Sequence, residues 1–142
     1  MPLDYRIVDA HRLVVIRAWG VIDDDGLVAH AHRFTSDPAV VRTYDQYADY
    51  TGVTGFPRAT PGGIAEGGAI MDAFEKNTPG IKLALVMGSM AAFGLGRMYQ
   101  LLRRAPIDIN VFRNHADALT WIGRPAQALE MAVWTGQGGR GA

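Results

Sequence analysis

The segment 81–102 constrains the fold of this chain more than any other stretch, and its sequence is IKLALVMGSMAAFGLGRMYQLL. Residues 83–87 are continuously apolar, which is typical of a strand that is covered on both faces. Gly88 interrupts this run, and Ser89 is a favourable N-cap for a helix that follows it. The apolar run is shorter than the roughly 20 residues that a membrane span requires. The segment therefore predicts a buried strand that turns tightly into a helix.

The helix after Ser89 is predicted to be amphipathic. Apolar residues recur on one side at helical spacing: Ala91, Leu95, Met98, Tyr99 and Leu102. Polar residues occupy the other side: Arg97, Gln100, Arg103 and Arg104. Gly94 and Gly96 lie inside the helix, where they indicate either close packing on a sheet or room for a ligand against the backbone. We favour packing.

Composition limits the classes of function. The chain has 142 residues, enough for one domain with a substantial core. Its 14 basic residues balance 14 acidic residues, so we expect no general attraction for nucleic acid. The absence of cysteine excludes disulfides and thiolate chemistry. The N-terminal sequence MPLDYRIVDA shows no export signal, and we therefore expect a cytoplasmic protein with no membrane span.

The N-terminal half predicts a hairpin, a helix and a third strand. Apolar strands at 5–8 and 13–20 are close enough in sequence to pair antiparallel. Three aspartates at 23–25 predict the start of a helix, because carboxylates there cap backbone amides and oppose the helix dipole. The third strand is expected at 44–50, followed by a loop over 51–59.

The C-terminal half continues the alternation. Thr60 and Pro61 predict the start of a glycine-rich helix over 61–76. After the segment 81–102, a strand at 107–111 and a short helix capped by Asn114 and closed by Gly123 are expected, with one more helix within 125–134. The order β-β-α-β-α-β-α-β-α predicts an α/β domain over 1–134, with a single mixed sheet of about five strands covered by helices. The tail 135–142 is predicted to be flexible.

Two stretches carry a resemblance to a known family. The run DYTGVT at 49–54 is similar to the D-L-S-G-V-T run that ends the third strand in anti-sigma-factor antagonists. The run AFGLGRMY at 92–99, with VFR at 111–113 and ALTWIG at 118–123, is similar to the C-terminal half of SpoIIAA-like proteins. The chain thus resembles the STAS domain, SpoIIAA-like group, over about residues 5–123. This resemblance implies the STAS fold, related to the lipid-binding CRAL-TRIO fold, and a non-enzymatic regulatory role.

The chain departs from the antagonist pattern in one respect. Antagonists carry a phosphorylated serine in a D-S-x-G motif after the third strand, whereas this chain has FPRATPG at 56–62. Thr60 is the nearest hydroxyl, and capping of the next helix is its expected role.

The sequence predicts no catalytic or metal-binding constellation. His30 and His32 lie two residues apart on a helix and cannot share a metal, so surface or capping roles are expected. Neither Ser36 nor Ser89 lies in a nucleophile elbow. We expect no enzyme activity, no cofactor and no metal.

Aromatic residues gather near the third strand: Trp19, Tyr44, Tyr47, Tyr50 and Phe56. Aromatic rings with polar tips are typical of interfaces and pockets, although they also fill cores. Our candidate binding residues lie here and on the central helix: Tyr50, Thr54, Phe56, Arg58, Thr60 and Arg97. The sequence favours a STAS-like regulatory or protein-interaction module that forms a homo-oligomer. The alternative is a carrier or sensor that holds an apolar or anionic ligand between the glycine-rich helix and the central helix.

Overall fold

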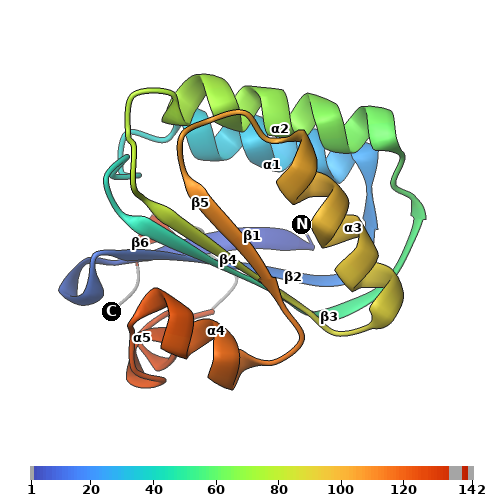
Figure 1. Ribbon diagram of the computed structural model, residues 1–142. Helices are drawn as coiled ribbons and strands as arrows, with labels where there is room; N and C mark the ends of the chain where they lie inside the picture. The colour runs from blue at the N-terminus through green and yellow to red at the C-terminus, as the bar shows by residue number, and fades with distance from the viewer. Residues whose placement is uncertain (1, 135–138, 141–142) are drawn as a thin grey trace.

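The computed structural model describes residues 2–134 and 139–140 (Figure 1). Its elements follow one another along the chain as β1 (Leu3–Val8), η1 (Asp9–His11), β2 (Leu13–Asp23), α1 (Asp24–Ser36), β3 (Asp45–Arg58), α2 (Pro61–Glu75), β4 (Lys82–Met87), α3 (Met90–Leu102), β5 (Asp108–Phe112), α4 (His115–Ile122), α5 (Gln127–Glu130) and the two-residue β6 (Gly139–Arg140).

The strands form one mixed sheet in the order β5-β4-β3-β2-β1-β6. The β1–β2 hairpin is antiparallel, as predicted, and β2, β3, β4 and β5 run parallel to their neighbours. Parallel neighbours require crossover connections, and here helices supply them. The predicted α/β class with a single mixed sheet is confirmed.

Helices cover both faces of the sheet, as Figure 1 shows: α1, α2 and α3 lie on one face, and α4 and α5 on the other. Side chains alternate between the two faces along each strand. On β4, Leu83, Leu85 and Met87 belong to the core under α1–α3. Ala84 and Val86 belong to the core under α4 and α5. A strand buried on both faces is what the continuous apolar run in 83–87 predicted.

The predicted helix caps are confirmed. Ser89, the N-cap of α3, accepts a hydrogen bond from the Ala92 N–H at 3.1 Å. Asn114 caps α4 in the same way, and Gly123 ends it in the left-handed region at φ 72°. Asp23 and Thr60 cap α1 and α2. Each cap satisfies a backbone donor that has no partner inside the helix.

The predicted loop after the third strand is wrong. Phe56, placed in that loop by the sequence, lies in β3, which continues to Arg58. The strand is long because β2 also continues past Gly20 and pairs with it through Asp23, with irregular register. An extended partner supplies hydrogen bonds that keep a glycine-containing segment in strand geometry.

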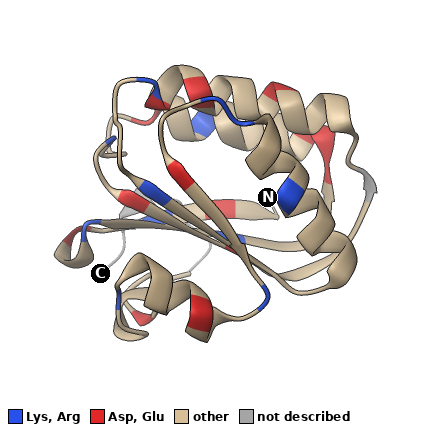
Figure 2. Ribbon diagram, in the orientation of Figure 1, with Lys and Arg blue, Asp and Glu red and all other residues tan. Residues whose placement is uncertain are grey.

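No helix in 2–134 or 139–140 combines the length and the apolar character needed to cross a bilayer. The predicted flexible tail lies outside the described residues except for Gly139 and Arg140, which pair parallel with β1. Figure 2 shows Lys and Arg interspersed with Asp and Glu over the helices and strands.

Asp24 joins the first turns of α1 and α2. Its carboxylate accepts hydrogen bonds from the backbone N–H of Thr60 at 2.8 Å and from the Thr60 hydroxyl at 2.6 Å. The Thr60 hydroxyl accepts in turn from the Gly63 N–H at 3.1 Å. A Cβ on Gly63 would lie 2.0 Å from Asp24 Cγ, so the contact requires glycine at position 63.

We predict that Gly63→Ala lowers the free energy of unfolding by about 1–2 kcal/mol, because the methyl group displaces the Asp24 carboxylate from Thr60. Gly62→Ala is the matched control, since a Cβ there would meet only the Thr60 hydroxyl, at 3.8 Å. The control should be neutral or raise stability by up to about 1 kcal/mol. Urea unfolding followed by circular dichroism measures both. Equal effects of the two substitutions would contradict the close approach of Asp24.

Candidate functional site

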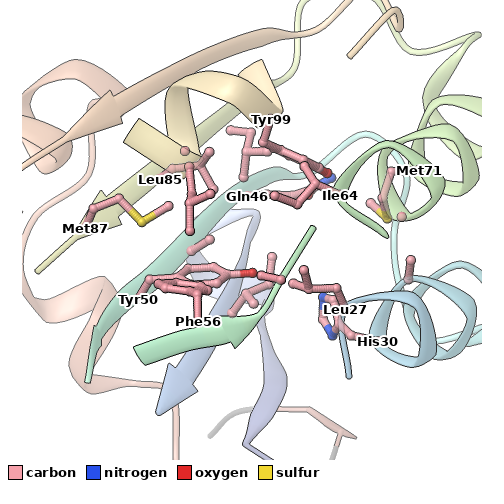
Figure 3. A pocket seen from close by; sticks show the side chains of 18 residues that line it. Leu27, His30, Gln46, Tyr50, Phe56, Ile64, Met71, Leu85, Met87 and Tyr99 are labelled. Carbon is pink, nitrogen blue, oxygen red and sulfur yellow. The ribbon is translucent and has the colours of Figure 1, made fainter. Parts of the chain in front are cut away.

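A cavity of about 90 Å³ lies between the sheet and the three helices α1, α2 and α3. Figure 3 shows the side chains that line it, from β2, β3 and β4 on the sheet and from all three helices. The wall is mostly aliphatic and aromatic, and its polar side chains are His30, Gln46, Tyr50 and Tyr99. None of the wall residues is Lys, Arg, Asp or Glu.

Small residues on four different elements line this space. Ala48 is central, because it lies on β3 between Ile16 of β2 and Leu85 of β4. Each of the three helices also presents a small residue to the cavity: Ala31 on α1, Gly67 on α2 and Gly96 on α3. A longer side chain at Ala31 or Ala48 would occupy part of the space. The glycines differ, because a Cβ on Gly96 would meet Met87 and Val111, and one on Gly67 would approach the backbone of Leu27.

His30 contributes a buried imidazole to the wall. The side chain is 9% exposed, and its Nδ1 atom is buried without a hydrogen-bond partner. On the side away from the cavity, the rings of Tyr5 and Phe34 lie 6.0 and 5.7 Å from the imidazole, centre to centre. Burial lowers the pKa of His30 to about 4, and the charge of Arg33 lowers it further while Asp4 opposes the shift. The imidazole is therefore neutral at neutral pH. The sequence prediction of a surface or capping role for His30 is wrong.

Tyr50 is the second polar group of the wall without a partner. Its ring comes from β3, and Figure 3 shows its hydroxyl directed towards α1, the helix that carries His30. This hydroxyl makes no hydrogen bond to any described residue. Burial raises the pKa of Tyr50, and Tyr99 raises it further, so the phenol stays protonated. It can both donate and accept a hydrogen bond.

A buried ion-pair network holds the other two polar groups of the wall. Arg103 donates to the Tyr99 hydroxyl at 2.8 Å, to Asp72 at 2.6 Å and to the fully buried Glu75. Glu75 also accepts from the Gln46 amide. Burial raises the pKa of Glu75, and Arg103 and Gln46 offset this only in part. Asp72 differs, because hydrogen bonds from Arg103 and the backbone hold its pKa below the usual value despite burial.

The sequence pattern placed Arg103 on the polar side of the central helix, and this prediction is also wrong. The helix ends at Leu102, and Arg103 adopts extended backbone angles of φ −74° and ψ 140°. Its side chain therefore leaves the helical pattern and turns back to α2, where it is buried.

The six predicted binding residues do not form one site. Tyr50 and Phe56 line the cavity. Thr54 is exposed, and Thr60 is occupied by capping and by Asp24.

The two predicted arginines lie elsewhere. The side chain of Arg58 lies outside the described part of the structure, although its backbone pairs with Asp23. Arg97 is exposed on α3 and donates to Gln100 at 2.8 Å, so it does not reach the cavity. The flanking glycines differ: Gly94 has open space around it, whereas Gly96 packs against Met87 and Val111.

His30, Gln46 and Tyr99 line the wall but were not predicted to do so from the sequence. The weak signal for His30 was its position four residues before Phe34, on the face of α1 that also carries Leu27. The signal for Gln46 was its spacing of two from Ala48, which places both on one strand face with Tyr50. Neither signal distinguishes a cavity wall from a filled core.

A second polar cluster lies on the opposite face of the sheet. The Tyr47 hydroxyl lies 2.7 Å from Nδ1 of His115, and Nε2 of His115 lies 3.7 Å from Asp49. Burial raises the pKa of Tyr47, and Asp49 raises it further. A fully buried phenol with a raised pKa is a poor nucleophile. This cluster therefore joins β3 to α4 and offers no catalytic arrangement.

Among residues 2–134 and 139–140, no group of three or more histidines and carboxylates is placed to hold a metal ion. No protein-family model matches the chain, and no curated protein is significantly similar to it.

We predict that His30 makes stability depend on pH between about 4 and 6.5. Its pKa is about 4 in the folded state against an ordinary value of 6.5, so the unfolded chain binds more protons in this range. The free energy of unfolding therefore falls as the pH falls from 6.5 to 4, by up to about 3 kcal/mol.

His30→Leu should remove this contribution. Urea unfolding of the wild-type and variant proteins at several pH values measures it, because the other groups, Glu75 and Asp72 included, titrate in both proteins. As the pH falls from 6.5 to 4, the free energy of unfolding of the wild type should fall further than that of the variant. Parallel pH curves for the two proteins would show that His30 is not buried in its neutral form.

Proposed function

We propose that this protein binds a small, neutral and largely apolar molecule in the cavity between the sheet and α1–α3, and acts as a carrier or sensor for it. One observation carries the proposal: an apolar cavity whose wall includes two polar side chains, His30 and Tyr50, without hydrogen-bond partners among the described residues. Ligand pockets typically combine an apolar lining with a few such polar groups. A purely structural core fills its space and pairs its polar atoms.

The volume limits the size of the ligand. A cavity of 150 Å³ in an engineered protein binds benzene, which corresponds to roughly 25 Å³ for each non-hydrogen atom. The 90 Å³ cavity therefore accepts a molecule of about four non-hydrogen atoms without rearrangement. Tyr50, Phe56 and Leu95 are partly exposed wall residues, so a longer ligand would extend past them towards solvent.

The charges favour a neutral ligand over the anionic one that the sequence analysis left open. An anion in an apolar cavity is strongly unfavourable unless a cation or several donors pair with it. Arg103 does not line the cavity, and its guanidinium already pairs with Glu75 and Asp72. Arg97 lies on the exposed side of α3.

The resemblance to STAS and CRAL-TRIO proteins adds support of a different kind, since lipid-binding relatives use apolar cavities. The STAS-like regulatory or protein-interaction module, and the homo-oligomer expected with it, stay predictions. Phosphorylation at Thr60 would have to break its hydrogen bonds to Asp24 and Gly63, which weighs against the antagonist mechanism.

We predict that Ala48→Leu abolishes ligand binding, because the added carbons occupy the centre of the cavity. Native mass spectrometry of the protein as purified should show a bound small molecule for the wild type and none for this variant. Xenon, followed by ¹²⁹Xe NMR, is an independent probe of apolar space. It should bind the wild type and be excluded from Ala48→Leu.

Ala91→Leu is the matched control, because it adds the same atoms at a residue of α3 that is exposed and does not line the cavity, although the sequence pattern placed it on the apolar side. It should bind xenon and ligand as the wild type does. Wild-type protein that repeatedly carries no small molecule and excludes xenon would refute the proposed function.

A further inference from the structure

The polar groups of the cavity wall fall into two pairs. Gln46 and Tyr99 are held by the buried charges of Glu75 and Arg103. His30 and Tyr50 have no hydrogen-bond partner among the described residues, although the His30 side chain is only 9% exposed. Buried polar groups in native proteins nearly always have a partner. The free pair therefore marks the part of the wall where a ligand completes the hydrogen bonding.

The position of the free pair supports this view. His30 comes from α1 and Tyr50 from β3, so two elements that pack face to face each direct one polar group into the same apolar space. In Figure 3 the Tyr50 hydroxyl extends from β3 towards the part of α1 that carries Leu27 and His30. One small polar group on the ligand would lie between them.

The chemistry of the pair defines that polar group. A neutral imidazole presents one donor and one acceptor, and a phenol hydroxyl can act as either. A ligand hydroxyl can donate to one partner and accept from the other, whichever ring nitrogen of His30 carries the proton. A carbonyl can only accept, so it pairs both groups only if the ring nitrogen of His30 that faces the cavity carries the proton. A carboxylate or ammonium group would bring an unpaired charge into a wall that contains no charged residue.

We propose that the ligand is a small alcohol whose hydroxyl group hydrogen-bonds to His30 and Tyr50 while its carbon skeleton fills the apolar part of the cavity. This inference rests on the proposed binding function and specifies its ligand class. The rest of the wall selects by size, through Ala31 and Ala48. His30 and Tyr50 select by chemistry, because they hydrogen-bond to the hydroxyl group of the ligand.

Three probes of nearly equal size and shape test the inference: propan-2-ol, acetone and isobutane. Each is titrated into the full-length protein and followed by ¹H–¹⁵N NMR. The wild type should bind propan-2-ol more tightly than acetone, and isobutane reports the apolar part of the cavity alone, because it has no hydroxyl to desolvate. Tyr50→Phe and His30→Leu should each weaken propan-2-ol by about five-fold, the loss expected for one hydrogen bond, and leave the affinity for isobutane unchanged.

Tyr47→Phe is the matched control, because it removes a hydroxyl from the same strand on the opposite face of the sheet. It should leave the affinity for all three probes unchanged. If acetone binds as tightly as propan-2-ol, or if the two wall variants leave propan-2-ol binding unaltered, hydroxyl recognition is overturned and the proposed binding function survives. If none of the three probes binds and xenon is excluded, both are overturned.

Discussion

The buried guanidinium of Arg103 is the interaction on which the helical layer over the cavity depends. It joins α2 to α3 through Glu75, Asp72 and Tyr99, and Glu75 extends the connection to Gln46 on β3. Removing one member would leave a buried charge or polar group unpaired, which typically costs about 3–5 kcal/mol. The network also determines the polarity of the cavity, because it occupies Gln46 and Tyr99. His30 and Tyr50 are left as the groups that a ligand can use.

The cavity lowers the stability of the folded protein. At the usual dependence on cavity volume, a space of 90 Å³ corresponds to an upper limit of roughly 2 kcal/mol of lost stability, because several residues of its wall are partly exposed. A leucine in place of Ala48 or Ala31 is a simple substitution that would remove most of that cost. His30 adds to it, because its buried Nδ1 atom has no hydrogen-bond partner. Several residues around one cavity thus lower the stability of the folded protein, and such a local loss of stability is characteristic of binding sites.

Local sequence patterns predicted most of the secondary structure, because caps and apolar periodicity act within a few residues of one another. Ser89, Asn114 and the apolar run at 83–87 are examples. The structural features that these patterns did not predict depend on contacts with residues far away in the sequence. The length of β3 depends on the continuation of β2, and the burial of Arg103 depends on a change of backbone angle one residue past α3 together with carboxylates on α2. His30 was predicted to be a surface residue, because the polarity of its side chain was given more weight than its position on the apolar face of α1.

The two ends of α2 are held by interactions of different strength, and this difference determines where the cavity wall yields first. At the C-terminal end, Glu75 is fully buried in the Arg103 network. At the N-terminal end, the hydrogen bonds between Asp24 and Thr60 are exposed to water, and their loss costs about 1–2 kcal/mol, less than the loss of a member of the buried network. Local opening takes place where burial is least. Ala59 and Ile64 line the cavity on either side of Thr60, so the weaker end of α2 lies beside the cavity.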